Sequence, residues 1–366
     1  MTGSQYDLRV MALGVNLADA CDRMSSGAMA HFPFRNFVHL TQSEAYDLMR
    51  NMLSGGMSTE GIAEVLSFLR RKGETIAELV GFASAIRDMS PPIELDQSQE
   101  PVLDTCGTGG DATNSFNVST ATAFVVAGAG LRVAKHGNRR ISSQCGSADV
   151  LEALGVSVSL SADHAIECIR RIGIGFLYAP LLHPAVKHAQ EARLLLKGRT
   201  VFNLLGPLTN PVRARVQLIG AFSVRAAEML AHASARLGIE RAFVVHGSDG
   251  LDEITTTGLT TVFQVEDGRV QKGQWSPGDF GVPEAAIDDL KGGDPETNAG
   301  IVRSVLDGEP GPRRDIVVVN AAAALLLAQT APDVKSALAM ASGSIDTGAA
   351  RAKLDQLTEL TSQLQA

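Results

Sequence analysis

Residues 216–246 read VQLIGAFSVRAAEMLAHASARLGIERAFVVH, and this segment gives the clearest indication of the fold class. Residues 216–223 form a short run typical of a strand, residues 225–237 follow a helical pattern that ends at Gly238, and residues 241–246 form a second strand-like run. A strand, a helix and a strand in this order make up the repeating unit of a parallel sheet. The segment therefore predicts an α/β domain.

The same alternation extends from about residue 101 towards the C-terminus. Residues 131–134 predict a strand, and residues 148–154 predict the helix that follows it. Near the C-terminus the β-branched run Ile316–Val319 continues the alternation. An alanine-rich helix is expected over residues 320–329 and a last helix around residues 347–364.

The residues before this region predict consecutive helices. Thr41-Gln-Ser-Glu44 and Thr75-Ile-Ala-Glu78 are capping boxes, in which the Thr hydroxyl and the Glu carboxylate bond N–H groups of the first turn. Ser58 predicts the start of the helix between them. Residues 90–100 are polar and contain two prolines, which is typical of a linker. We predict a helical domain over residues 1–97, with 1–30 as a weakly patterned extension, and an α/β domain over residues 98–366.

Composition and charge exclude several classes of protein. The 366 residues carry a formal net charge of −8 and only 5% aromatic side chains, which argues against binding to nucleic acid. Four cysteines without a CxxC pair indicate neither a disulfide framework nor a zinc site. The most apolar run, residues 317–328, is too short to span a bilayer, and the N-terminal apolar run is too short for a signal peptide. We therefore predict a cytoplasmic protein that binds no membrane.

Two neighbouring segments have the composition of an anion-binding site. Asp104-Thr-Cys-Gly-Thr-Gly-Gly-Asp111 is a glycine-rich loop after a predicted strand, and its backbone N–H groups can point at an anion. Asn117-Val-Ser-Thr120 precedes an apolar run, so Ser119 and Thr120 fall at a helix N-terminus, which favours phosphate. Taken alone, each segment has an alternative: a plain glycine turn for the first and ordinary helix capping for the second.

Two polar segments further along add charge. Lys135-His-Gly-Asn-Arg-Arg-Ile-Ser-Ser143 lies between a predicted strand and a predicted helix, and its cations and hydroxyls suit a phosphate clamp. Asp252-Glu253 offers carboxylate oxygens for Mg²⁺. A solvated polar loop and an exposed acidic loop are the respective alternatives. The triplet Ser-Ala-Asp at residues 147–149 and 161–163 predicts a serine-capped helix start at both places.

Other reactive side chains receive simpler interpretations. Arg193 can pair with a ligand carboxylate through two guanidinium nitrogens. His183 and His188 are five residues apart, which is not a metal-binding spacing, and we predict structural roles for both. Cys106 and Cys145 have no histidine close in the sequence and are predicted to be packing residues.

Together these motifs closely resemble the anthranilate phosphoribosyltransferase family. CGTGGD, NVST, KHGNR, GSADVLEALG, HPA, GRTVFN and DGLDE occur in this order, and the resemblance runs from about Leu40 to near the C-terminus. It implies a small helical domain, joined by helices around residues 185–205, and a large α/β domain whose mostly parallel central sheet is flanked by helices. It also implies a homodimer formed through the helical domain.

The resemblance further implies the reaction. The 5-phosphoribosyl group of phosphoribosyl pyrophosphate would pass to the amine of anthranilate, with inversion at the ribose carbon, as a step in tryptophan biosynthesis. No residue is expected to act as a general acid or base. Lys135, Asn138 and Arg193 would position the substrates and stabilise charge.

The matching positions supply the expected site. Residues around phosphoribosyl pyrophosphate would be Gly107, Gly110, Asp111, Ser115, Asn117, Val118, Ser119, Thr120, Lys135, Gly137, Asn138, Arg139, Ser142, Ser143 and Ser147. Ser119, Asp252 and Glu253 would hold Mg²⁺, with two ions in each site. Asn138 and Arg193 would contact anthranilate, and Gly107, His136, Ala179 and Pro180 would line the same channel.

The sequence departs from the family pattern at three places. The glycine that usually stands one position earlier is Gly198, which bears on the shape of the segment after Arg193. Arg140 replaces a residue that is usually small, and the N-terminal extension has no clear counterpart.

Two other functions are compatible with parts of the pattern. A pyrimidine nucleoside phosphorylase shares the fold but uses inorganic phosphate, and the Asp252-Glu253 pair and the complete KHGNR run argue against it. A non-catalytic relative that binds nucleic acid or another partner should have lost ligands and gained basic surface. The intact motifs and the net charge of −8 argue against that alternative.

Overall fold

The computed structural model describes residues 39–365, except 92, 99, 111–112 and 140–143. The chain divides into two units, Met1–His39 and Leu40–Ala366, and the elements below belong to the second. The predicted extension over residues 1–30 and the predicted site residues Asp111, Ser142 and Ser143 therefore lie outside the described residues, as does Arg140. No helix in the described ranges has the length and apolarity needed to cross a membrane.

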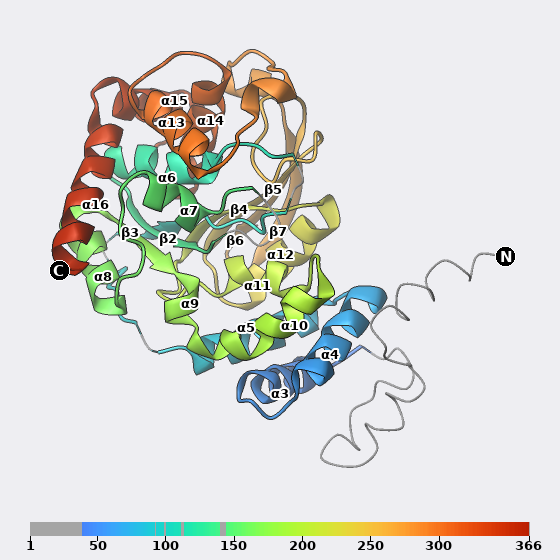
Figure 1. Ribbon diagram of the computed structural model, residues 1–366. Coiled ribbons are helices and arrows are strands. Elements are labelled where there is room, and N and C mark those ends of the chain that lie inside the picture. Colours follow the sequence, from blue (N-terminus) through green and yellow to red (C-terminus); the bar gives the residue numbers. More distant parts are fainter. Residues whose placement is uncertain (1–38, 92, 99, 111–112, 140–143, 366) are drawn as a thin grey trace. The chain divides into compact units, whose positions relative to one another are not determined.

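Between residue 39 and the first strand, the described residues form three helices: α3 (Gln42–Leu53), α4 (Thr59–Lys72) and α5 (Ile76–Met89). Both predicted capping boxes are confirmed, and Ser58 caps α4 as predicted. The buried carboxylate of Glu78, from the second box, also pairs with Lys72 Nζ at 2.6 Å. A helix from much later in the chain, α10 (Lys187–Leu196), packs against α4 and α3 (Figure 1).

In the described part of the chain, seven strands form one sheet in the order β3-β2-β1-β4-β5-β6-β7. The five strands from β3 to β5 in this order are parallel, and β6 and β7 are antiparallel, so the predicted mostly parallel sheet is confirmed. The strands are β1 (Val102–Asp104), β2 (Arg132–Gly137), β3 (Ile174–Tyr178), β4 (Val216–Gly220), β5 (Arg241–Gly247), β6 (Thr260–Glu266) and β7 (Arg269–Trp275).

Helices cover both faces of the sheet (Figure 1). Crossovers between parallel strands are right-handed, so helices that lead in opposite directions along the sheet lie on opposite faces. One face carries α6 (Val118–Gly128), α13 (Pro295–Leu306), α14 (Pro312–Leu327) and α15 (Val334–Asp346), and the other carries α11 (Val201–Leu208) and α12 (Val224–Arg236). The remaining elements are α7 (Ser147–Ala153), α8 (Ala162–Ile172), α9 (Ala179–Leu182), α16 (Ala349–Gln365) and the 3₁₀ helices η3 (Pro184–Val186), η4 (Pro277–Phe280) and η5 (Ile287–Leu290).

Two sequence-based predictions about these elements are wrong. The run Ile316–Val319 is not a strand, because α14 is one helix over Pro312–Leu327 that starts with a proline in its first turn. This run is fully buried, and packing on several sides outweighs the β preference of its residues. At residues 147–149 the cap is Gly146 and not Ser147, whereas Ser161 caps α8 as predicted.

The topology brings the polar segments to one edge of the sheet. From β1 the chain moves to β2 on one side, while β4 lies on the other side of β1, so the strand order reverses between β1 and β4. Ligands of α/β proteins bind beyond the carboxyl ends of the strands at such a reversal. The loops after β1, β2 and β5 contain residues 105–110, 138–139 and 248–253 respectively.

Candidate active site

The glycine loop after β1 is held by the end of β4 and by an acidic side chain. Gly109 and Gly110 have φ angles of 62° and 74°, a backbone conformation that favours glycine. The N–H of Thr108 donates to the carbonyl of Gly220 at 2.8 Å, and the N–H of Gly109 donates to Asp252 Oδ2 at 2.9 Å. The predicted loop and the predicted acidic pair, far apart in the sequence, are therefore in direct contact.

The N-terminus of α6 meets the second carboxylate. The N–H of Ser119 donates to Glu253 Oε1 at 3.1 Å. Asn117 stands at the N-cap without a capping bond from its side chain, and it instead accepts from Asn298 Nδ2 at 2.9 Å. Ordinary capping by Asn117 therefore does not explain this segment. Among the described residues, the buried Thr120 Oγ1 has no hydrogen-bond partner.

Lys135 bonds both the glycine loop and the N-terminus of α6. It is 4% exposed, and its Nζ donates to Thr105 Oγ1 at 3.1 Å and to Ser119 Oγ at 3.2 Å. Burial lowers the pKa of the Lys135 ammonium, and neighbouring acidic groups, including Asp104 and Glu253, oppose that shift. The structure thus brings Lys135, Ser119 and the acidic pair into one cluster.

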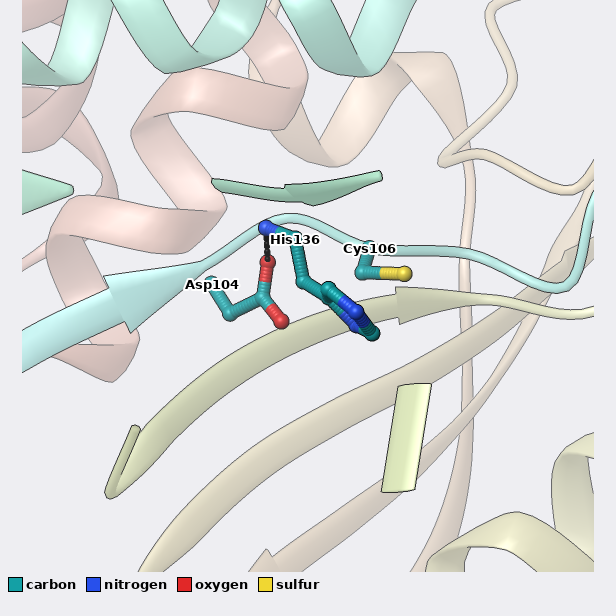
Figure 2. Close-up of side chains that lie close together, drawn as sticks. All are labelled: Asp104, Cys106 and His136. Atoms are coloured by element: carbon teal, nitrogen blue, oxygen red, sulfur yellow. Dashed lines mark hydrogen bonds between the residues drawn. The ribbon is translucent and has the colours of Figure 1, made fainter. Parts of the chain in front are cut away.

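A second polar cluster lies at the ends of β1 and β2 (Figure 2). Figure 2 shows the side chains of Asp104, Cys106 and His136 gathered together, with the His136 backbone N–H donating to Asp104 Oδ1 at 3.1 Å. Asp104 Oδ2 accepts from Asn210 Nδ2 at 2.8 Å. Burial raises the pKa of Asp104 to about 6. The proximity of Cys106 to His136 is a contact that sequence spacing missed.

This second cluster is a poor metal site. Atoms of Asp104, Cys106 and His136 lie within 4.8 Å of one another, but both oxygens of Asp104 already accept hydrogen bonds. Burial raises the pKa of the Cys106 thiol, so the thiolate that a soft metal requires is disfavoured. The cluster is better explained as a set of contacts that fix the strand ends, in which Cys106 is half-buried.

His136 of this cluster lies beside a second buried histidine, His183. The rings of His136 and His183 are 5.1 Å apart, edge to face. His136 Nδ1 lies 3.1 Å from the carbonyl of Gly206, which can only accept, so Nδ1 carries the proton. Among the described residues, Nε2 of each histidine has no partner. His183, which sequence spacing assigned to structure alone, therefore lies beside a predicted site residue.

We expect these histidines to make the protein sensitive to acid. Burial lowers the pKa of His136 to about 3 and that of His183 to about 4, from an ordinary value of 6.5. The unfolded chain therefore binds these protons first, so the stabilisation is present above about pH 6.5 and is lost as pH falls towards the folded-state pKa. Between about pH 7 and about pH 5.5, the wild type should lose about 1 kcal/mol more free energy of unfolding than His183→Gln.

Urea unfolding at the two pH values measures this difference. The exposed His188 supplies the control, since His188→Gln should follow the wild type at both values. Equal losses in all three proteins would contradict the assignment.

The predicted phosphate-binding residues in and after the segment that follows β2 have different surroundings. Ser147 Oγ donates to the carbonyl of Asn138 at 3.3 Å, and the tight approach of Gly137 to Ser147 leaves no room for a side chain at residue 137. Arg139 points elsewhere: its guanidinium pairs with Glu152 of α7, with Nη2 to Oε1 at 2.7 Å, and bonds the Tyr178 hydroxyl. Arg139 is therefore held away from the Lys135 cluster.

The remaining predicted residues lie at the rim or in the helix. Ser115 pairs with Lys291 in an isolated β-bridge, and Val118 is buried at the start of α6. Pro180 is exposed in the first turn of α9. Gly107 lies close to Gly220 and Asp252, because a methyl group at residue 107 would meet the Gly220 carbonyl oxygen and Asp252 Oδ2.

Arg193 lies in the last turn of α10. Its guanidinium carbon is 4.8 Å from the centroid of the Phe202 ring in α11. Burial lowers the pKa of Arg193 to about 10, so it stays charged at neutral pH. Directly after this helix, Lys197 has a φ of 41° and Gly198 has a φ of 139°. Lys197 therefore takes a backbone conformation that glycine adopts more easily, which is the structural counterpart of the shifted glycine.

The oxygen atoms of the first cluster suit a hard divalent cation. Asp252 and Glu253 are half-buried. Ser119 of α6 bonds Glu253 through its N–H and Lys135 through its Oγ. Carboxylate and hydroxyl oxygens are ligands that Mg²⁺ accepts, and it commonly bridges such carboxylates to substrate phosphates.

Comparison with known proteins first gives the class to which this fold and site belong. Residues 34–90 match the helical bundle domain of a glycosyl transferase family, and residues 99–351 match the a/b domain of the same family. The chain belongs to this family and, within it, to the anthranilate phosphoribosyltransferases. It is 54% identical over 321 residues to the anthranilate phosphoribosyltransferase of Solibacter usitatus, covering 88% of this chain and 94% of the relative. It is 49% identical to that of Pelotomaculum thermopropionicum, covering 89% and 94%.

Solved structures agree with this assignment. The anthranilate phosphoribosyltransferase of Thermus thermophilus is similar with a TM-score of 0.83 and 39% identity, covering 90% of this chain and 97% of that one. The Saccharomyces cerevisiae enzyme, in complex with PRPP and Mg, is similar with a TM-score of 0.81 and 28% identity, covering 88% and 94%. A further structure of the yeast enzyme contains 4-fluoroanthranilate, with a TM-score of 0.79 and 27% identity, covering 88% and 94%.

Proposed function

We propose that this protein transfers the 5-phosphoribosyl group from phosphoribosyl pyrophosphate to the amine of anthranilate, giving N-(5-phosphoribosyl)anthranilate and pyrophosphate in tryptophan biosynthesis. One observation supports this most: two neighbouring segments and an acidic pair more than 130 residues later meet where the strand order of the sheet reverses. The glycine loop, the start of α6 and the pair Asp252-Glu253 are joined there by hydrogen bonds, with Lys135 beneath them. The named relatives and the yeast complexes with PRPP, Mg and 4-fluoroanthranilate support the choice of substrates.

Charge stabilisation at this cluster would drive the reaction. Departure of pyrophosphate develops positive charge on the ribose and negative charge on the leaving group. Lys135 and the N–H groups of the glycine loop would stabilise the negative charge. Asp252, Glu253 and Ser119 would hold two Mg²⁺ ions, which supply further positive charge against the phosphate oxygens. The proposed phosphoribosyl pyrophosphate site also includes Gly107, Gly110, Asp111, Ser115, Asn117, Val118, Thr120, Gly137, Arg139, Ser142, Ser143 and Ser147. Arg139 would join this site by leaving its ion pair with Glu152.

Positioning would supply the remainder of the rate enhancement. An aromatic amine is uncharged at neutral pH, so it can attack without a general base. The proton that the nitrogen then loses would pass to the departing pyrophosphate or to water. Arg193 would fix the anthranilate carboxylate and Asn138 the amine side, with His136 and Pro180 lining the channel. Attack from the face opposite the leaving group gives inversion.

Three broader properties are part of the proposal. We propose a helical domain over residues 1–97 and an α/β domain over residues 98–366, with helices around residues 185–205 joining the helical domain. The packing of α10 on α4 supports this last point. We also propose a homodimer formed through the helical domain and a cytoplasmic location.

The experiment follows the fluorescence of anthranilate with purified protein and phosphoribosyl pyrophosphate. A fall in fluorescence that needs Mg²⁺ and stops with EDTA supports the transfer. No change with both substrates and Mg²⁺ present would overturn it. Thymidine or uridine with phosphate then tests the nucleoside phosphorylase alternative.

Removal of Arg193 should mainly weaken anthranilate binding. Arg193→Ala deletes the guanidinium that would bond the carboxylate, and a charge-assisted bond of about 1.5–3 kcal/mol corresponds to a rise in anthranilate KM of about 10- to 100-fold. The KM for phosphoribosyl pyrophosphate should change little. Steady-state kinetics with each substrate varied in turn measures both constants. Arg171→Ala, at an exposed pair with Glu167, is the control and should leave both unchanged. An unaltered anthranilate KM in Arg193→Ala would refute this role.

A further inference from the structure

One side chain joins the segment between α10 and α11 to the glycine loop. Arg199 Nη2 donates to the carbonyl of Gly110 at 2.7 Å. The guanidinium carbon of Arg199 also lies 4.3 Å from the centroid of the Phe222 ring. The Phe222 N–H in turn donates to Thr108 Oγ1 at 3.1 Å. Arg199 therefore reaches the loop twice, once directly and once through Phe222.

The two contacts require a guanidinium. Its flat face can lie over an aromatic ring while its edge donates to a carbonyl, because the donors lie in the plane of the group. A lysine ammonium is a point charge and is more strongly hydrated, so it makes one of these contacts at the expense of the other. The geometry therefore favours arginine over a general positive charge.

The loop that Arg199 contacts carries the N–H groups of the proposed phosphate site. The Gly109 N–H, one residue before the bonded carbonyl, donates to Asp252 Oδ2 at 2.9 Å. Gly109 and Gly110 have φ angles of 62° and 74°, and glycines lose much conformational freedom when they are held in one conformation. A bond to the Gly110 carbonyl therefore restricts the most permissive part of the loop.

The same segment also continues from the residue proposed to hold anthranilate. Arg193 lies in the last turn of α10, six residues before Arg199, and its guanidinium lies over Phe202 of α11. Between them, Lys197 and Gly198 set the path of the backbone with φ angles of 41° and 139°. Arg199 thus makes a contact between this segment and the glycine loop.

We propose that Arg199 is a positioning residue for the transfer reaction: it holds the Gly107–Gly110 loop in the conformation that binds the diphosphate of phosphoribosyl pyrophosphate. This inference rests on the proposed function. It assigns to Arg199 no contact with substrate, since the guanidinium acts through Gly110 and Phe222.

The test compares Arg199→Ala and Arg199→Lys with the wild type. Loss of a charged hydrogen bond and of ring stacking should raise the KM for phosphoribosyl pyrophosphate about tenfold in Arg199→Ala, with the anthranilate KM within about twofold of wild type. Arg199→Lys should recover only part of this loss. Calorimetric titration with inorganic pyrophosphate and Mg²⁺ should show weaker binding in the same order.

Two matched variants separate positioning from charge and from folding. Arg70→Ala removes an exposed cation close to Gly198 of the same segment, and should leave both KM values unchanged. Phe222→Leu keeps Arg199 but removes the ring, and should raise the KM for phosphoribosyl pyrophosphate by less than Arg199→Ala does. Thermal unfolding of each variant checks that the fold is retained.

The outcomes are distinguishable from failure of the proposed function. If the wild type transfers no phosphoribosyl group, the proposed function itself fails. If the wild type is active but Arg199→Ala keeps its KM for phosphoribosyl pyrophosphate, the positioning role is wrong. Full recovery in Arg199→Lys would also overturn it, because charge alone would then suffice.

Discussion

Asp252→Asn should lower kcat by about 100-fold or more while the protein stays folded. Asn keeps the size of Asp252 and one oxygen that can accept from the Gly109 N–H, but it loses the negative charge that would bind Mg²⁺. A metal ion contributes several kcal/mol of charge stabilisation in such reactions, and each factor of ten in rate corresponds to about 1.4 kcal/mol. The loss should therefore appear mainly in turnover and less in anthranilate binding.

Measurement of kcat over a range of Mg²⁺ concentrations tests this expectation. Calorimetric titration of Mg²⁺ in the presence of inorganic pyrophosphate gives a second readout, and Asp252→Asn should bind more weakly. Asp267→Asn is the control, because it removes one negative charge at the β6–β7 turn, where φ is 50° and Asn is well tolerated. A kcat for Asp252→Asn within about threefold of wild type at saturating Mg²⁺ would contradict the proposed role of Asp252 in holding the metal ion.

Gly220→Ala should damage both stability and activity. A methyl group at residue 220 would overlap the backbone carbonyl of Asp252, so one of the two segments must move. Gly220 ends β4, and its own carbonyl accepts from the Thr108 N–H of the glycine loop, so its position is fixed on that side. Overpacking of this kind costs about 1–3 kcal/mol, and displacement of a site residue by about 1 Å can lower the rate about 100-fold.

Urea unfolding and kcat of Gly220→Ala together check this prediction. Gly300→Ala is the matched control: it lies inside α13, and a methyl group there meets nothing within 4 Å. The control should keep full activity and gain about 0.5–1 kcal/mol of stability, since alanine is the better helix former. If Gly220→Ala matches Gly300→Ala in both kcat and free energy of unfolding, the close approach of Gly220 to Asp252 does not matter for activity or stability.

Local sequence signals predicted the elements that depend on neighbours in the chain. The capping boxes at Thr41 and Thr75 form as expected, because their bonds span three residues. The strand–helix–strand unit over residues 216–246 also forms as expected, because its two strands pair across a single helix. The hairpin of β6 and β7 was not predicted, although Asp267-Gly268 at its turn is a recognisable signal. The β-branched residues of Ile316–Val319 predicted a strand. The prediction failed because residue preference has little weight in a segment that is completely buried.

The site was predictable as a set of segments but not as a set of contacts. Glycine content and charge identified the loop at Gly107 and the pair at Asp252 separately. The bond between them joins residues 143 positions apart, and its existence depends on the strand order. The same holds for His183 beside His136 and for Arg199 on Gly110, for which spacing along the chain carries no signal.

The bonds from the Gly109 and Ser119 N–H groups to Asp252 and Glu253 have a consequence for the order of binding. Each N–H has one hydrogen to donate, so a phosphate oxygen and a carboxylate compete for it. The carboxylates of Asp252 and Glu253 thus compete with a bound anion for these N–H groups. A cation that binds the carboxylates would free the N–H groups for the anion. Linkage then requires the cation and the diphosphate to strengthen each other's binding. Titration of inorganic pyrophosphate with and without Mg²⁺ measures this coupling, and equal affinities would exclude it.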